Sequence, residues 1–163
     1  MAEQTPAPGN GQAVPQRQLA LQKIYVRDAS FEVPNAPAIF QDDGQPQVQL
    51  NLSHKAAQLS EGNYEVVLTL TATCTLKDRT AYLAEVQQAG VFAAIGFPKE
   101  ELDAVLGSYC PNVLFPYARQ IISDLVQNGG FPPLLLQPIN FDALYAEQQQ
   151  RAIAGDAAPS LNA

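Results

Sequence analysis

Apolar and polar residues alternate along the segment VVLTLTATCTL, which runs from Val66 to Leu76. The apolar side of this pattern carries Val66, Leu68, Leu70, Ala72, Cys74 and Leu76. The other side is mostly threonine. Because successive side chains of a strand point to opposite faces, a period of two predicts a strand with one buried face. The many β-branched residues favour the same structure.

Three other segments predict strands that pair with this one. Residues 46–53 repeat the alternation more briefly and place Val48, Leu50 and Leu52 on one face. Residues 22–33 and 81–94 are predicted as two more strands, and a tight turn at Lys77–Arg79 leads into the second of them. Consecutive strands with short links favour an antiparallel sheet.

The pattern becomes helical after the last predicted strand. Pro98 is a suitable first helical residue, and three acidic residues follow where they favour the helix dipole, so a helix is predicted over 98–110. A second helix is predicted to start near Pro116, with apolar residues spaced three and four apart, and to end at Gly129–Gly130.

The segment 131–141 is apolar but contains three prolines, so we expect an extended loop there. A last helix is predicted from about Asp142 to Ala152. Four strands followed by helices predict an α+β domain, a four-stranded antiparallel sheet packed by C-terminal helices.

The length of 163 residues fits one domain, which we place at 18–152. Residues 1–17 and 153–163 are rich in small and polar residues and are predicted to be disordered tails. The chain has no apolar run as long as a membrane span, and its first residues lack the features of a signal peptide. We therefore expect a cytoplasmic location.

The formal net charge of −7 opposes binding to nucleic acid or to an anionic membrane and suits a basic partner. Cys74 and Cys110, the two cysteines of the sequence, have no neighbours at ligand spacing. No metal site or other cofactor is therefore predicted, and the expectation is two buried free thiols.

Two long segments are almost without charge. Residues 104–122 contain only Arg119, and residues 81–97 contain only Glu85. A well-filled core is one explanation for so much apolar surface. Subunit contacts together with a binding groove are the other, and we prefer it because charge is missing from both segments.

Candidate catalytic residues are few. His54, the one histidine, is predicted to lie in a polar turn, and pairing it with Cys110 as a nucleophile has little support. No enzyme is predicted. Asp28 and Glu32 share one face of a predicted strand, with Ser30 between them, and the residues alone favour a simple exposed strand face over a binding site.

Four segments together give the chain a family resemblance. They are RDASFEVPNAP at 27–37, AEVQQAGVF at 84–92, YCPNVLFPYAR at 109–119 and FPPLLLQPINFDALY at 131–145. The chain resembles the SecB family of bacterial protein-export chaperones over nearly all of the predicted domain. This resemblance implies a homotetramer, a dimer of dimers, without catalysis, nucleotide or metal. Such proteins hold precursors unfolded in the cytosol and deliver them to SecA, the motor ATPase.

The resemblance also implies two kinds of site. Asp28, Glu32, Leu83 and Glu85 match positions that bind the basic, zinc-bearing C-terminal tail of the motor, and the zinc belongs to that partner. Val48, Leu50, Leu52 and Tyr145 match the apolar client groove, and Tyr25 fits as a further groove aromatic.

Two departures from the family pattern affect the groove. The last helix becomes polar after Tyr145, and Gly44 stands where members of the family can carry a large aromatic residue. We therefore expect a groove of altered shape. The alternative function is an oligomeric adaptor that binds the motor tail but no unfolded chain. The two functions differ in whether apolar surface stays accessible in the oligomer.

Overall fold

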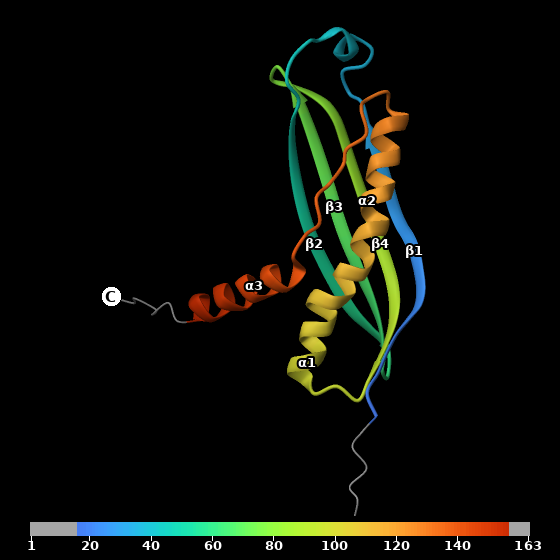
Figure 1. The fold of residues 1–163 in the computed structure, drawn as a ribbon, viewed down its shortest axis with the longest axis vertical. Helices are drawn as coiled ribbons and strands as arrows, with labels where there is room; N and C mark the ends of the chain where they lie inside the picture. Colours follow the sequence, from blue (N-terminus) through green and yellow to red (C-terminus); the bar gives the residue numbers. More distant parts are fainter. Residues whose placement is uncertain (1–15, 157–163) are drawn as a thin grey trace, which may run out of the picture.

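The protein is built around one long antiparallel sheet, seen in a computed structural model that describes residues 16–156 (Figure 1). Its four strands are β1 (Gln18–Glu32), β2 (Gln47–Ser60), β3 (Asn63–Leu76) and β4 (Arg79–Ile95). Their order across the sheet is β1-β4-β3-β2. The four predicted strands are confirmed, and each is longer than the alternation indicated. The predicted tails lie largely outside the described residues.

The central hairpin is closed by the predicted tight turn. Lys77 and Asp78 have φ angles of 46° and 63° between the paired residues Leu76 and Arg79. Two residues with positive φ match the right-handed twist of the strands that they join. The turn therefore fixes the register of β3 against β4, in which Ala72 lies opposite Ala84.

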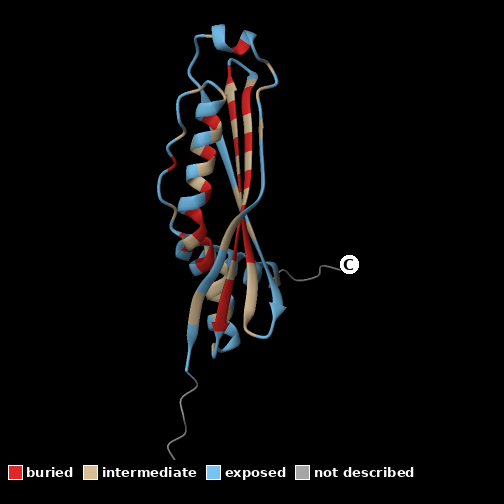
Figure 2. Ribbon diagram, turned by 90° about the vertical axis from the view of Figure 1, so that its right-hand side faces the viewer, coloured by how far each residue is buried: buried red, intermediate tan, exposed pale blue. Residues whose placement is uncertain are grey.

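One face of the sheet carries the core. The even-numbered residues of β3, from Val66 to Leu76, are all buried, while the threonines between them are half-buried. Figure 2 shows this alternation along the central strands, with a helix on one side of them. Cys74 and Cys110 are free and buried, as predicted. We call the helix-covered side the packed face and the other side the open face.

The helices that cover the packed face form one continuous run. α1 (Lys99–Ala104) passes through a π-helical turn (Val105–Tyr109) into α2 (Cys110–Asn128). The prediction of a new helix near Pro116 is wrong, because Pro116 lies inside α2. A buried stripe explains why the helix continues there. Its members are fully buried and spaced four apart: Cys110, Leu114, Ala118, Ile122 and Val126. Burial of this stripe outweighs the hydrogen bond that proline cannot make.

The chain after α2 runs extended along the packed face and then forms α3 (Phe141–Asp156). Figure 1 shows α3 pointing away from the sheet. Buried Phe141 anchors its first turn, with its ring 5.7 Å from that of Phe115. The helix continues four residues beyond the predicted end at Ala152. Within residues 16–156, no helix is both long and apolar enough to cross a membrane.

The connection between β1 and β2 crosses one end of the sheet, because these two strands form its opposite edges (Figure 1). We call residues 33–46 the crossover. It contains a short 3-10 turn (Ala38–Gln41) whose Ile39 is buried in the core. The crossover is thereby fixed over the end of the packed face.

Candidate binding surfaces

A partly uncovered row of apolar side chains runs along β2 on the packed face. Val48 and Leu50 are 39% and 44% exposed, and Leu52 is half-buried. Their partners on β3 are the core residues Cys74, Ala72 and Leu70. α2 contacts β4 and β3, and the π-helical turn contacts β2, so the helices cover the Leu52 end of the row and leave Val48 and Leu50 exposed. The structure thus brings three of the predicted groove residues together at an accessible sheet edge.

A pocket of 470 Å³ adjoins Val48 at the crossover end of this row. Three of its lining residues are aromatic: Phe40 from the crossover, Tyr82 from β4 and Phe131 from the segment after α2. The ring of Phe131 lies 5.2 Å from that of Phe40 and 5.0 Å from that of Tyr82. Because aromatic rings attract other rings and aliphatic chains, this pocket suits a large apolar side chain.

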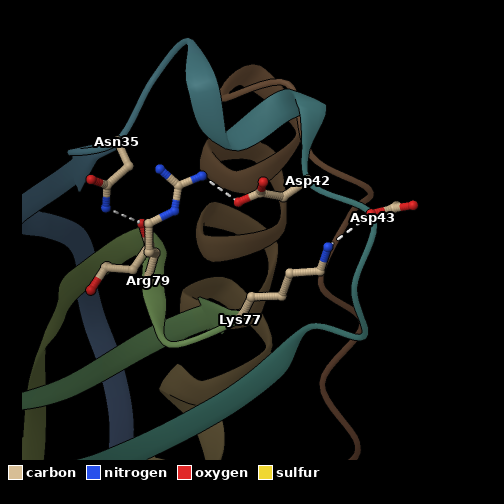
Figure 3. Close-up of polar contacts among 6 residues, drawn as sticks. Asn35, Asp42, Asp43, Lys77 and Arg79 are labelled. Atoms are coloured by element: carbon tan, nitrogen blue, oxygen red, sulfur yellow. Dashed lines mark hydrogen bonds and ion pairs between the residues drawn. The ribbon is translucent and has the colours of Figure 1, made fainter.

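The rim of the pocket is tied to the hairpin turn by polar contacts (Figure 3). Asp42 pairs with Arg79, and the Asp43 carboxylate accepts a hydrogen bond from the Lys77 ammonium at 2.8 Å. Asn35 also donates to the backbone carbonyl of Thr80 at 2.9 Å. The hydrogen bond from Lys77 lowers the pKa of Asp43. We call these contacts the crossover latch.

Gly44 lines the pocket beside this latch. A Cβ atom at this position would lie 3.1 Å from Cγ of Lys77, a close contact that the flexible lysine could relieve. The absence of a side chain leaves space at the mouth of the pocket. The altered groove shape expected from Gly44 stays a prediction.

Tyr145 adjoins the opposite end of the apolar row. It lines a pocket of 120 Å³ together with Leu52, His54 and Gly107. A Cβ atom at Gly107 would lie 2.7 Å from the Tyr145 ring, so glycine is needed for this close approach. Beyond Tyr145, α3 is exposed and polar, and its contact with the sheet edge is confined to its first turns.

His54 does not lie in a turn, as was predicted, but within β2. The alternation of β2 places it on the packed face, where it is half-buried, and burial lowers the pKa of its imidazole. Cys110 is fully buried, and burial raises the pKa of its thiol to about 12. A buried thiol that stays protonated is a poor nucleophile, which removes the basis for a catalytic pair.

Tyr25 is separated from the other predicted groove residues. It lies opposite Ala89 on the open face of the sheet, near Glu65. Partial burial and a hydrogen bond with the Glu65 carboxylate raise the pKa of its phenol. Tyr25 therefore lies on the face opposite Leu50, because the bulge after Val26 interrupts the alternation of β1. Its role as a groove residue stays a prediction.

The four positions matched to motor binding form one patch on the open face. Ser30 lies opposite Glu85, and Glu32 lies opposite Leu83, so Asp28 and Glu32 flank Glu85. The Glu85 carboxylate accepts a hydrogen bond of 3.1 Å from the Thr71 hydroxyl, which holds it against the sheet. The structure therefore brings all four residues together, on the face opposite the apolar row.

Sequence reasoning missed Phe40, Tyr82 and Phe131 as pocket residues. Their signal was weak because they belong to three segments that meet only in the folded chain. The ion pairs of the crossover latch left a signal in the sequence, since the acidic pair DD at 42–43 and the basic residues of KDR at 77–79 have opposite charges. Their pairing depends on the crossover, whose path the alternation does not give.

Comparison with known families shows which family the chain belongs to. The family model described as "Preprotein translocase subunit SecB" matches residues 12–152. A protein-export protein SecB from Methylococcus capsulatus is 58% identical over 138 residues, covering 85% of this chain and 89% of the relative. One from Xanthomonas euvesicatoria is 52% identical over 164 residues, covering 94% and 96%. The chain belongs to the SecB family.

A solved structure shares the fold. It is the SecB-like chaperone of Mycobacterium tuberculosis in complex with a ChAD peptide from the HigA1 antitoxin. The TM-score is 0.58 at 19% sequence identity, with 74% of this chain and 90% of that chain covered. At this identity the likeness concerns the fold alone.

Proposed function

We propose that this chain, a protein-export chaperone by its family, holds unfolded precursor proteins in the cytoplasm and delivers them to the SecA motor. The observation that carries the proposal is the exposed row of Val48 and Leu50 on an edge strand, next to an aromatic pocket. Such a surface has no use in an isolated folded chain, and it fits an extended apolar segment.

Client binding follows from ordinary burial of apolar area. Each Å² of apolar surface removed from water contributes about 25 cal/mol. The edge of β2 also offers backbone hydrogen bonds to any extended sequence. Contacts with several weak sites add up to high avidity. A folded protein exposes no such segment, so the groove selects unfolded chains without reading a motif and without ATP.

The second function of the proposed chaperone uses the open face. Asp28, Glu32 and Glu85 suit the lysines and arginines of a basic, zinc-bearing motor tail, and Leu83 adds an apolar contact. The groove and this patch lie on opposite faces of one sheet, so a client and the motor can be bound together. Delivery then requires no exchange of one partner for the other at a shared site.

We also propose that the chain assembles as a homotetramer, a dimer of dimers. Tyr109 and Tyr117 on the helical run are about half exposed in the single chain. They belong to the segment 104–122, in which Arg119 is the one charged residue. Association of such helical surfaces would cover these rings.

The first experiment is light scattering on a sizing column, with and without an unfolded secretory precursor. We expect a mass near four subunits that rises by one client only when the client is unfolded. A tetramer that ignores the unfolded chain would favour the alternative, an oligomeric adaptor that binds only the motor tail.

The patch is tested by replacing Asp28→Ala together with Glu85→Ala. Because both carboxylates face the proposed basic tail, we expect weaker motor binding and nearly unchanged client binding. The matched control is Glu61→Ala with Glu100→Ala, which removes two negative charges from a turn and from the start of α1. Equal loss of motor binding and client binding, or an equal loss of motor binding in the control, would refute the assignment of this patch to the motor.

A further inference from the structure

The charges of the open face are separated by sign along the strands. The acidic patch of Asp28, Glu32 and Glu85 occupies the half nearer the crossover. Toward the other end, Lys23 lies opposite Val91 and Lys55 lies opposite Val67, and both lysines belong to the same face. The face therefore has an acidic half and a basic half. This polarity is independent of the groove on the packed face.

These charges have no ion-pair partner within the described part of the chain. Among residues 16–156, the ion pairs include none of the three carboxylates of the acidic half. The same holds for the two lysines of the basic half. A protein that needed the charges only for its own stability would pair them across neighbouring strands, where opposite charges attract. They are instead left free for a second molecule.

A neutral cluster lies within the basic half, because Glu65 is level with Lys23 and Tyr25 is level with Lys55. The guanidinium of Arg27 pairs with the Glu65 carboxylate at 3.0 Å, and the Tyr25 phenol also contacts that carboxylate. These contacts neutralise the charges of Arg27 and Glu65, so the open lysines and the open carboxylates remain distinct. The bulge between Val26 and Asp28 brings Arg27 toward this face.

Register gives the separation of the two halves. Glu85 of β4 pairs directly with Thr71 of β3. Lys23 of β1 and Glu65 of β3 both pair with Val91 of β4, so Lys23 is level with Glu65. At a rise of about 3.3 Å per residue, the two levels are roughly 20 Å apart. An extended segment spans this distance with about six residues.

We propose that the open face binds an extended partner segment with two oppositely charged ends. Lysines or arginines of the segment lie over the acidic half, and a carboxylate about six residues away lies over Lys23, which shares strand β1 with Asp28 and Glu32. This inference rests on the proposed motor-binding function and specifies the chemistry of the partner. Reversal of the segment would place like charges together, so the face also selects one orientation.

Three labelled peptides of equal length test this preference on the full chain. The first carries a basic block followed by neutral residues. The second carries the same block with two glutamates placed six residues beyond it, and the third has the composition of the second with its charges interleaved. Net charge alone would favour the basic peptide, since the protein carries −7. We expect the second peptide to bind at least as tightly as the first and roughly fivefold more tightly than the third.

Lysine variants assign the effect to the face. Lys23→Gln should weaken the second peptide by roughly two- to threefold, the contribution of one exposed pair, and leave the first unchanged or tighter. The matched control is Lys55→Gln, which removes one positive charge from the opposite edge strand of the same face. An interleaved peptide that binds as well as the second, or a lysine variant that matches its control, would overturn the proposal.

The same titrations keep this inference apart from the proposed function. If the basic peptide binds and depends on Asp28 and Glu85, the motor patch stands whether or not the second peptide is preferred. If the basic peptide does not bind at all, the patch itself is wrong and the inference falls with it.

Discussion

Leu50→Ala is the most direct test of the groove. Complete burial of a leucine side chain contributes about 1.5–3 kcal/mol. Because Leu50 is 44% exposed in the single chain, a bound client can remove from water only this remaining part, about 0.7–1.3 kcal/mol. Alanine keeps some of that contact. We therefore expect a loss of about 0.5–1 kcal/mol, or a rise in Kd of roughly two- to fivefold.

The assay is fluorescence anisotropy of a labelled, unfolded precursor, with the melting temperature of each variant measured alongside. Leu59→Ala is the matched control, because Leu59 lies on the same strand, is 54% exposed and is far from the crossover pocket. The control should bind clients almost normally. An unchanged Kd for Leu50→Ala, or an equal loss in Leu59→Ala, would refute the placement of the groove.

Two further predictions concern the packed face. Removal of the two ion pairs of the crossover latch by Lys77→Gln with Arg79→Gln should raise hydrogen exchange a few-fold in residues 33–46. Exchange in β3 should stay unchanged, because Ile39 and the Asn35 hydrogen bond still hold the crossover. An equal rise of exchange in both segments would contradict a local role. Burial raises the pKa of Cys110 from 9.0 to about 12, so the folded chain keeps a proton that the unfolded chain loses and stability falls as pH rises between these values. In Cys110→Ala, the free energy of unfolding should therefore fall less with pH than in the unmodified chain, by about 2 kcal/mol at pH 10.5. Thermal unfolding over this pH range measures the difference, and the same pH dependence in both proteins would exclude this linkage.

The sheet was predictable because alternation is a local signal. Val66 to Leu76 defined a strand and its buried face without any knowledge of the partners. The strand ends were less clear, since β2 continues through His54 and Lys55 where the apolar alternation has stopped. Hydrogen bonding to β3 extends β2 there, and the sequence of one strand does not show which strand it pairs with.

The helix boundaries and the pocket depended on tertiary packing. Pro116 is a strong local signal for a helix start, yet the buried stripe of α2 passes through it. The acidic patch could be named from the family resemblance, and register then explains why its members meet. The aromatic pocket could not be named, because Phe40 and Phe131 are distant in sequence and meet only where the crossover passes the end of α2.

The strand order also affects how the chain is made. β1 and β2 leave the ribosome first, but β1 pairs with β4 and β2 pairs with β3. Each of these edge strands must therefore wait, unpaired, for a central strand, and β1 waits until residue 95 has been synthesised. At about 5–20 residues per second this delay lasts several seconds, much longer than hairpin formation. During its own synthesis, this chaperone exposes the kind of extended, apolar segment that its finished groove is proposed to hold.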